Sequence, residues 1–289
     1  MKSMENSSPH TSQGKMIRKI DGALEHFDHR KLIHSLRRSG ADERIVRDIA
    51  AHVETHITDG MSTDDIYRHA RMLLKGTHKT AAVKYSLRRA LFSLGPTGFP
   101  FEDFLGALFA SQGYETKTGV VLKGRCVEHE VDLIAYKKDH CLIAEAKFHS
   151  YPAMKSDLHV ALYCKARFDD LQGIKHSQHQ SCEVLDSYII TNTKFTHVAT
   201  QYATCVGIKL LSWNYPKEKT LQDHIEAAGI YPITALTTLS VHAKRQLIEH
   251  GVILCKDMEK KRDVLRSLGF TAQKIETVIE ESVNICMSR

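Results

Sequence analysis

The sequence predicts an α/β protein in three parts: a mostly helical N-terminal domain with a β-hairpin, a central mixed α/β core and a helical C-terminal segment. Three observations predict this arrangement. Apolar residues recur at helical spacing through residues 32–94, a pattern typical of packed amphipathic helices. Between residues 97 and 213, strand-like apolar runs alternate with helical ones. Helical spacing then returns from Leu221 to the end of the chain.

Composition limits the class of protein. The chain has 289 residues, of which 42% are hydrophobic and 26% charged, as is typical of a soluble protein with two or three domains. No apolar run approaches the ~20 residues that a membrane helix needs, so we expect no membrane partner. Residues 1–14 are polar without a signal-peptide core and predict a disordered lead-in.

Cysteine and charge add two further limits. The seven cysteines include no C-x-x-C pair, which argues against a disulfide framework or a cysteine zinc site and favours a reducing, cytoplasmic setting. The formal net charge is +6, and the whole excess lies in residues 1–95, because residues 96–289 carry equal numbers of basic and acidic side chains. A basic balance suggests an anionic partner, but this excess is too small to show which one.

Residues 15–95 predict the first domain. Two short extended pieces flank Asp21-Gly22, a dipeptide that favours a hairpin turn. Four helices follow, and the third begins at the cap sequence Ser62-Thr63-Asp64-Asp65. The fourth runs through AAVKYSLRRALFSL and ends at Gly95-Pro96.

His52 and His56 share the i,i+4 spacing of one helix face. The sequence there is HVETH, which lacks the Glu directly after the first His of a zinc-protease helix. We therefore expect a solvated helix face rather than a metal site.

Residues 97–215 predict the central domain, which follows the joint LGPTGFP. An apolar helical stripe begins at Phe101, and three strand-like pieces follow: ETKTGVVL, EVDLIAY and CLIAEAKF. A helix, a strand, a second helix and the strand IKLLSW complete the order α-β-β-β-α-β-α-β.

The chemistry concentrates in EVDLIAYKKDHCLIAEAKFH, two apolar runs joined by the polar turn KKDH. Glu145 and Lys147 are two residues apart on one strand and so share a face, and pairing across the turn brings Asp132 toward them. Two converging carboxylates repel unless a cation lies between them. Oxygen ligands suit Mg²⁺ or Mn²⁺, and a neighbouring lysine can orient a water, so the stretch predicts metal-assisted phosphodiester hydrolysis. A surface E-x-K pair on an edge strand is the alternative.

The same stretch resembles the PD-(D/E)XK nuclease superfamily, especially its Mrr-type restriction endonuclease branch, over residues 97–213. The likeness is carried by an acidic residue in the leading helix (Glu102 in FEDFLGALFASQGY), by Asp132 in EVDLIA and by Glu145-Ala146-Lys147. Many Mrr-type members have Gln at the position of Glu145. The resemblance implies a restriction-endonuclease-like core in which Asp132 and Glu145 bind metal, Lys147 serves the attacking water and Glu102 supports the metal.

The resemblance also directs attention to basic residues around this strand. It gives His149 a place at the substrate phosphate, although an ordinary strand-end histidine is the competing interpretation. The following helix, KSDLHVALYCKARFDDL, carries Lys155, Lys165 and Arg167, and the sequence does not rank one above another.

The first domain offers a candidate phosphate site. The hairpin brings Lys19 and Glu25 near the start of a helix at Asp28, with Lys31 one turn further on, and lysines beside a helix N-terminus can hold phosphates. A solvated basic surface is the alternative. No G-x-x-x-x-G-K-[ST] loop occurs, so a P-loop ATPase is not expected.

The pattern I-R-K-I-D-G-x5-D-x-x-K-L-x-x-S-L resembles the ATP-cone, the nucleotide-sensing module of ribonucleotide reductases, over residues 15–94. S-T-D-D-I-Y and A-A-V-K-Y-S-L-R-R-A fit the second half of that module. The resemblance implies a regulatory site for ATP or dATP. Its nucleotide-binding candidates are Lys19, Glu25, Lys31, Thr63, Lys84 and Arg88. A basic residue often follows the Lys19 position in the family, where this chain has Ile20.

Residues 216–289 predict a helical C-terminal domain. LTTLSVHAKRQLIEHGVILCKDM resembles helix-hairpin-helix modules, in which glycine turns approach DNA phosphates, and KDMEKKRDVLRS adds basic residues. A plain helical bundle that packs on the core or on another subunit is the alternative.

Two functions follow from the sequence. The first is a metal-dependent deoxyribonuclease, regulated by ATP or dATP, that forms homo-oligomers and acts in restriction or defence against foreign DNA. The second is a nucleotide-responsive DNA-binding regulator without catalysis. The ATP-cone also occurs in a repressor family behind a Cys₄ zinc ribbon. This chain has no such ribbon and does carry the nuclease residues, so the sequence favours the enzyme.

Overall fold

The structure is a computed structural model that describes residues 14–138, 140–176 and 182–287. The expected lead-in over residues 1–14 therefore lies outside the described residues except for Gly14. The chain divides after Ala82 into two compact units. No helix in the described ranges combines the length and apolar character that crossing a bilayer requires.

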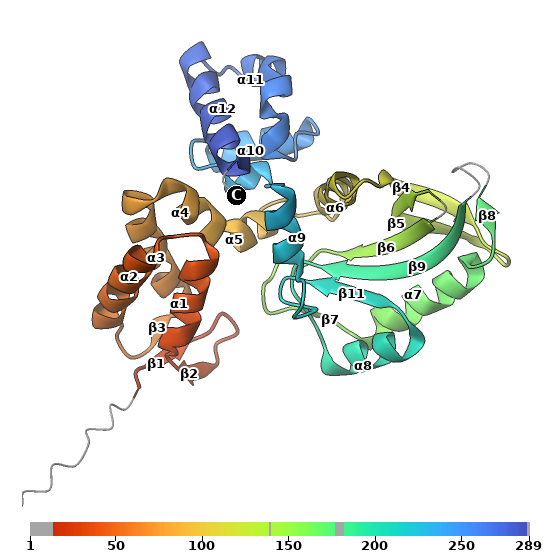
Figure 1. Ribbon diagram of the computed structural model, residues 1–289, viewed down its shortest axis with the longest axis horizontal. Helices are drawn as coiled ribbons and strands as arrows, with labels where there is room; N and C mark the ends of the chain where they lie inside the picture. Colours follow the sequence, from red (N-terminus) through yellow and green to blue (C-terminus); the bar gives the residue numbers. More distant parts are fainter. Residues whose placement is uncertain (1–13, 139, 177–181, 288–289) are drawn as a thin grey trace, which may run out of the picture. The chain divides into compact units, whose positions relative to one another are not determined.

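The first unit combines a small sheet with helices (Figure 1). The predicted hairpin is confirmed: Gly22 has a positive φ of 86°, which glycine adopts without strain, and the strands on either side pair antiparallel. The third strand joins in parallel, which gives the order β2-β1-β3. The elements are β1 (Met16–Arg18), β2 (Leu24–His26), α1 (His29–Arg38), α2 (Glu43–His56), β3 (Met61–Ser62) and α3 (Thr63–Thr77).

The predicted fourth helix is divided in two. The helix α4 (Lys79–Tyr85) spans the point where the units divide, and α5 (Leu87–Phe92) follows it. Between them the N–H of Ser86 bonds the carbonyl of Val83 at 2.9 Å, an i to i+3 bond that tightens the last turn and ends α4.

The second unit is built on a mixed sheet of strand order β11-β9-β6-β5-β4 (Figure 1). The strands β4, β5 and β6 form an antiparallel meander, and β6, β9 and β11 run parallel. The predicted order of helices and strands is confirmed in its main elements. These are α6 (Phe99–Ser111), β4 (Glu115–Lys123), β5 (Glu128–Lys137), β6 (His140–Lys147), β7 (Lys155–Ser156), α7 (Leu158–Leu171), β8 (Lys175–His176), β9 (Cys182–Thr191), β10 (Lys194–Phe195), α8 (His197–Val206) and β11 (Lys209–Ser212).

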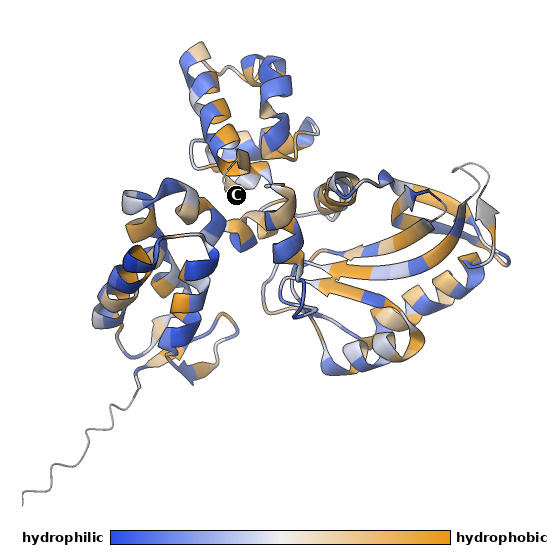
Figure 2. Cartoon of the chain, in the orientation of Figure 1, coloured by the Kyte–Doolittle hydropathy of each residue, from blue (hydrophilic) through white to orange (hydrophobic). Residues whose placement is uncertain are grey.

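Two helices cover opposite faces of this sheet. Leu105 of α6 shares an apolar cluster with Leu133 and Ala144, whereas Phe168 of α7 shares another with Ile134 and Ile143. Figure 2 shows the consequence as long apolar stretches along the central strands. A strand buried on both faces loses the polar alternation of a half-exposed one.

The C-terminal helices share the core of α6 rather than forming a core of their own. One buried cluster contains Phe104, Leu236 and Val278 together with Leu87 and Leu91. The predicted boundaries near residues 95 and 216 therefore differ from the compact units, because residues 83–94 and 216–287 pack with the central domain. The elements here are α9 (Leu221–Ala228), η1 (Ile233–Ala235), α10 (Val241–Glu249), η2 (Cys255–Lys261), α11 (Arg262–Ser267) and α12 (Ala272–Met287).

Candidate active site

The β5–β6 hairpin forms as the sequence predicts. Lys137 pairs with His140 across a tight turn in which Lys138 has a positive φ of 55°. The pairing continues to Leu133 opposite Ala144. One residue further along, Asp132 comes opposite Glu145, so both predicted carboxylates meet at this end of the hairpin.

A local irregularity of β5 allows the Asp132 side chain to reach the neighbouring strand β6. Its neighbours Val131 and Leu133 belong to the clusters on opposite faces, so the strand changes face at Asp132. On β4 the corresponding position is Gly119, whose φ of +59° interrupts the regular pleat. The Asp132 carboxylate then reaches β6, where it accepts the Ala146 N–H at 2.7 Å.

Glu145 is buried, with 5% of its side chain exposed, and is held by two cations. The Lys147 ammonium lies 2.5 Å from its Oε1, and the Arg167 guanidinium contacts its Oε2. Burial acts to raise the pKa of Glu145, but Arg167 and Lys147 outweigh it and hold that pKa below its ordinary value. Glu145 is therefore an anion at neutral pH.

The pKa values of Glu102 and Asp132 shift in the opposite direction to that of Glu145. Burial, followed by the charges of Asp132 and other nearby carboxylates, raises the pKa of Glu102 to about 7. Burial and then the charge of Glu145 raise the pKa of Asp132. Both carboxyl groups bind protons more tightly than usual, because burial and neighbouring negative charges disfavour their ionised forms.

The donor set fits a hard divalent cation. Asp132 and Glu145 supply carboxylate oxygens, the ligands that Mg²⁺ and Mn²⁺ take. A carboxylate has about four lone-pair sites, so Glu145 keeps acceptor capacity beside its two ion pairs. Asp132 and Glu145 are the residues that would hold the ion, and Glu102 is near enough for their charges to help raise its pKa.

Arg167 is the site residue that the sequence left unranked. It is 4% exposed, donates to the Glu130 carbonyl at 2.8 Å and contacts Glu145. Its Nε is buried and has no hydrogen-bond partner among the residues that the structure describes. A signal existed, because Arg167 falls on the buried helix stripe of Ala161, Cys164 and Leu171 at spacings of three and four.

The other basic candidates lie differently. His149 bonds Asn192 through its backbone and Ser156 through its ring at 3.0 Å, and burial followed by the charge of Lys147 lowers its pKa. Lys165 pairs with Asp169 on the same helix, and Lys155 is exposed on β7. The structure therefore brings Arg167, rather than either lysine, to the carboxylates.

A concavity of about 410 Å³ lies beside Arg167, and its lining includes Arg125 and His129 as well as the acidic Asp169 and Asp170. Asp170 holds one wall in place, because it accepts the backbone N–H groups of Cys126 and Val127 and contacts His129 Nε2 at 2.8 Å. Arg167 thus contacts Glu145 of the carboxylate site and also lines a concavity of mixed charge.

The candidate nucleotide residues of the first unit come together in part. Lys19 lies 2.6 Å and Lys31 3.4 Å from the Glu25 carboxylate, and both ammonium groups are well exposed. Thr63 is beside them along the backbone, because Arg18 pairs with Ser62 in parallel strands and Lys19 and Thr63 are the next residues. Lys31 lies in the first turn of α1, whose N-cap is Asp28.

Lys84 and Arg88 belong to the second unit. Arg88 is partly buried: its guanidinium lies 5.7 Å from the Phe92 ring centroid, and burial lowers its pKa. The structure therefore assigns the six candidates to two units, four in the first and these two in the second.

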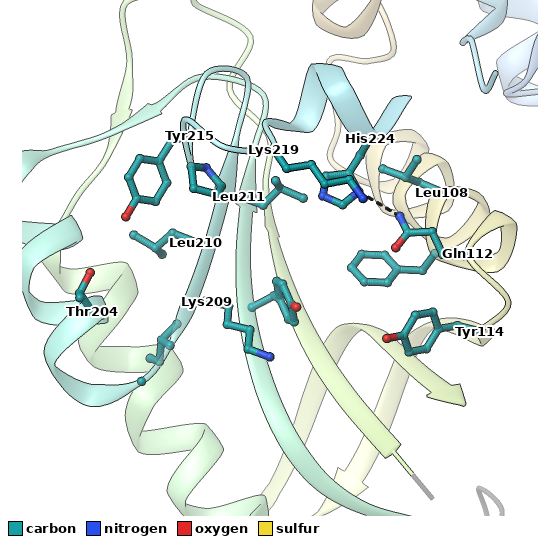
Figure 3. Close-up of a pocket in the computed structure, with 15 residues that line it drawn as sticks. Leu108, Gln112, Tyr114, Thr204, Lys209, Leu210, Leu211, Tyr215, Lys219 and His224 are labelled. Atoms are coloured by element: carbon teal, nitrogen blue, oxygen red, sulfur yellow. Dashed lines mark hydrogen bonds between the residues drawn. The ribbon is translucent and has the colours of Figure 1, made fainter. Parts of the chain in front are cut away.

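A larger cavity of about 470 Å³ lies along β11 and the end of α6 (Figure 3). Gln112 and His224 meet there through a hydrogen bond of 3.3 Å. Lys209 lies 5.4 Å from the Tyr188 ring centroid and pairs with Asp186 at 2.7 Å. None of the three carboxylates lines this cavity, so it is separate from the candidate hydrolytic site.

Comparison with known proteins identifies the family. An uncharacterized protein of Archaeoglobus fulgidus is 36% identical over 182 residues, which are 63% of this chain and 99% of the relative. The crystal structure of AF1548, a protein of unknown function, matches with a TM-score of 0.53 and 33% identity, covering 67% of this chain and all of that one. Residues 231–286 match the family described as AF1548-like, C-terminal. The chain belongs to this AF1548-like family.

A weaker likeness links the chain to the MspJI restriction endonuclease in complex with a 27-mer oligonucleotide. Its TM-score is 0.31 and its identity 13%, over 59% of this chain and 36% of that one. A likeness at this level supports no conclusion about activity.

Proposed function

We propose that this protein is a metal-dependent nuclease that hydrolyses phosphodiester bonds in DNA. The proposal rests on the meeting of Asp132 and Glu145 at one end of the β5–β6 hairpin, with Lys147 paired to Glu145 and Glu102 near enough for their charges to help raise its pKa. Clustered titratable groups with raised pKa values are typical of functional sites. The choice of DNA rests on the resemblance of these motifs to PD-(D/E)XK nucleases.

A bound Mg²⁺ or Mn²⁺ would polarise the phosphoryl oxygen and lower the pKa of a coordinated water. Asp132 and Glu145 would bind and orient that ion, with Glu102 supporting it. Such a cation would also offset the repulsion among these acidic groups.

Lys147 has an electrostatic role in this proposal. Burial acts to lower its pKa, but the hydrogen bond and charge of Glu145 outweigh burial and hold the pKa above its ordinary value. The side chain therefore stays an ammonium and does not act as a base. With 35% of its surface exposed, it can donate to an attacking water or to the oxygen on which negative charge develops.

Arg167 positions Glu145 and adds positive charge. Its guanidinium fixes one carboxylate oxygen of Glu145.

We further propose that the first unit binds ATP or dATP and regulates the nuclease. Two exposed lysines flank Glu25 near the start of α1. Thr63 directly follows β3, the strand that pairs with β1. Lysines supply charge for phosphates, and a helix N-terminus supplies N–H donors. We also propose that the chain forms homo-oligomers whose assembly state changes with nucleotide, and that it acts in defence against foreign DNA.

The test combines circular and linear DNA with the purified chain, in EDTA, Mg²⁺ or Mn²⁺, and with or without ATP or dATP. The proposal expects cleavage only with the divalent ion and a change in rate with nucleotide. DNA binding without cleavage under every condition would instead favour a nucleotide-responsive DNA-binding regulator.

A further inference from the structure

The fold brings a third histidine, His69, beside the His52–His56 pair. His52 and His56 lie near the end of α2, and His69 lies on α3. The rings of His52 and His56 stack with centroids 4.3 Å apart, and each lies 5.2 Å from the His69 ring. One potential ligand atom from each residue lies within 4.8 Å of the others.

We propose that His52, His56 and His69 form a binding site for Zn²⁺ or a similar borderline divalent ion. Neutral imidazoles are ligands for zinc, nickel and copper, whereas Mg²⁺ and Ca²⁺ take oxygen. The site therefore differs in chemistry from the carboxylate cluster of the second unit. Metal binding by these histidines does not depend on the proposed nuclease function.

The tautomer of His56 suits metal binding. Its Nδ1 lies 2.8 Å from the His52 carbonyl oxygen, which can only accept, so Nδ1 carries the proton. The lone pair is then on Nε2, which is free to bind a metal. Ligating histidines in proteins commonly donate their other ring N–H to a carbonyl in this way.

The exposure of the three rings allows the closure that a metal needs. Zn–N bonds of about 2.0–2.1 Å in a tetrahedral site place ligand nitrogens roughly 3.3 Å apart, so the ring nitrogens have to approach by up to about 1.5 Å. His52 and His56 are exposed and His69 is half-buried, so the first two rings can rotate toward the third. Three protein ligands leave one tetrahedral position for water.

A metal here would join α2 to α3. The chain between these helices includes β3, which pairs with β1, the strand that leads directly to Lys19. Binding that is specific to the folded state stabilises that state by mass action. We therefore expect Zn²⁺ to stabilise the first unit, including the scaffold of the candidate nucleotide residues.

The test titrates ZnCl₂ into the full chain by calorimetry, after treatment with EDTA and dialysis, without an affinity tag and with Mg²⁺ in excess. His52→Ala and His69→Ala, which remove one ligand from each helix, should each weaken this site by at least about 100-fold, because losing only an outer-shell partner of a ligand already costs about 10–100-fold. His34→Ala is the matched control, because His34 is exposed on α1 outside the cluster.

Two further readouts separate coordination from folding. Zn²⁺ should raise the melting temperature of the wild type and of His34→Ala but not of His52→Ala, whose exposed side chain is not part of the core. Co²⁺ should give the visible absorption of a four-coordinate ion that the same variant loses. Zn²⁺ stoichiometry and affinity unchanged in the His52→Ala/His69→Ala double variant would overturn the proposal.

Discussion

At the scale of single residues, the balance of charge around Glu145 decides what the carboxylate cluster can bind. Glu145 keeps its charge because Lys147 and Arg167 contact both of its oxygens. Burial and neighbouring carboxylates raise the pKa values of Glu102 and Asp132. A divalent ion would relieve the repulsion among all three.

Lys147→Ala tests the proposed role of the ammonium group. We expect a loss of DNA cleavage of about 10²–10³-fold, similar to the loss of one donor that stabilises developing charge. DNA binding should persist, since phosphate contacts are spread over many side chains. Cleavage assays and gel-shift titrations measure the two effects. Lys117→Ala is the control, because Lys117 is an exposed lysine on β4. Equal cleavage by Lys147→Ala and wild type would show that Lys147 has no part in the reaction.

Glu102 predicts a pH dependence of stability in EDTA. Its pKa is raised to about 7 in the fold, above its ordinary value of 4.5. Its contribution to stability is therefore fully present below pH 4.5 and is lost as the pH rises through 7. Glu102→Gln should stabilise the metal-free protein at pH 8 by about 1–3 kcal/mol, after discounting for partial exposure, and this gain should vanish below pH 4.5.

Thermal melts in EDTA across this pH range measure the effect of Glu102→Gln. Glu128→Gln, an exposed glutamate on β5, controls for the loss of one negative charge. If both variants gave the same shift at pH 8, the stabilisation would come from net charge rather than from the carboxylate cluster.

At the scale of elements, Arg167 joins α7 to the hairpin. Its removal leaves Glu145 buried with Lys147 as its remaining cation, and breaking a buried ion pair from one side costs about 3–5 kcal/mol. Arg167→Met should therefore destabilise the second unit by about 3 kcal/mol, since Lys147 still compensates in part. The Arg167→Met/Glu145→Gln double variant should recover most of this loss.

Trp213 gives a direct readout of that prediction. It is the single tryptophan of the chain and packs against the main core cluster of the second unit. Urea unfolding followed by its fluorescence therefore reports on that unit. Equal losses in the Arg167→Met single variant and the double variant would mean that Arg167 acts through packing and not through Glu145.

The elements show what the sequence could predict and what it could not. The hairpin over residues 130–149 was predictable because its apolar runs alternate and its turn is polar, so local pattern and fold agree. The buried stripe of α7 distinguishes Arg167 from Lys165, but the helix pattern does not identify its partner Glu145, which lies on a strand. His69 was not joined to His52 and His56 because it lies on another helix, and sequence spacing describes one helix face at a time.

At the scale of the whole molecule, the division after Ala82 separates the candidate nucleotide residues Lys19 and Lys31 from the carboxylate cluster. A ligand that does not enter the reaction can act only through a conformational or assembly equilibrium. Its effect is then limited to about 1–3 kcal/mol, or about 5–150-fold. We expect ATP or dATP to change cleavage or oligomeric state without being consumed, with inhibition by dATP slightly favoured.

Lys31→Ala tests this coupling. It should weaken ATP and dATP binding by about tenfold, as the loss of one charged hydrogen bond to phosphate does, and it should remove the nucleotide effect while basal cleavage persists. Calorimetry, sedimentation and cleavage assays measure these effects, with the exposed Arg44→Ala of α2 as the control. Failure of the intact chain to bind either nucleotide at millimolar concentration would refute the regulatory proposal and leave the nuclease proposal standing.

Metal-dependent cleavage by this site is tested by the rate at which a supercoiled plasmid is cut in Mg²⁺, compared between wild type, Asp132→Asn and Lys147→Ala, with an EDTA arm for each. We expect cleavage by the wild type with Mg²⁺, none in EDTA, and losses of at least about 100-fold in both variants while each stays folded. Cleavage that persists in EDTA, or that both variants retain, would contradict the nuclease proposal.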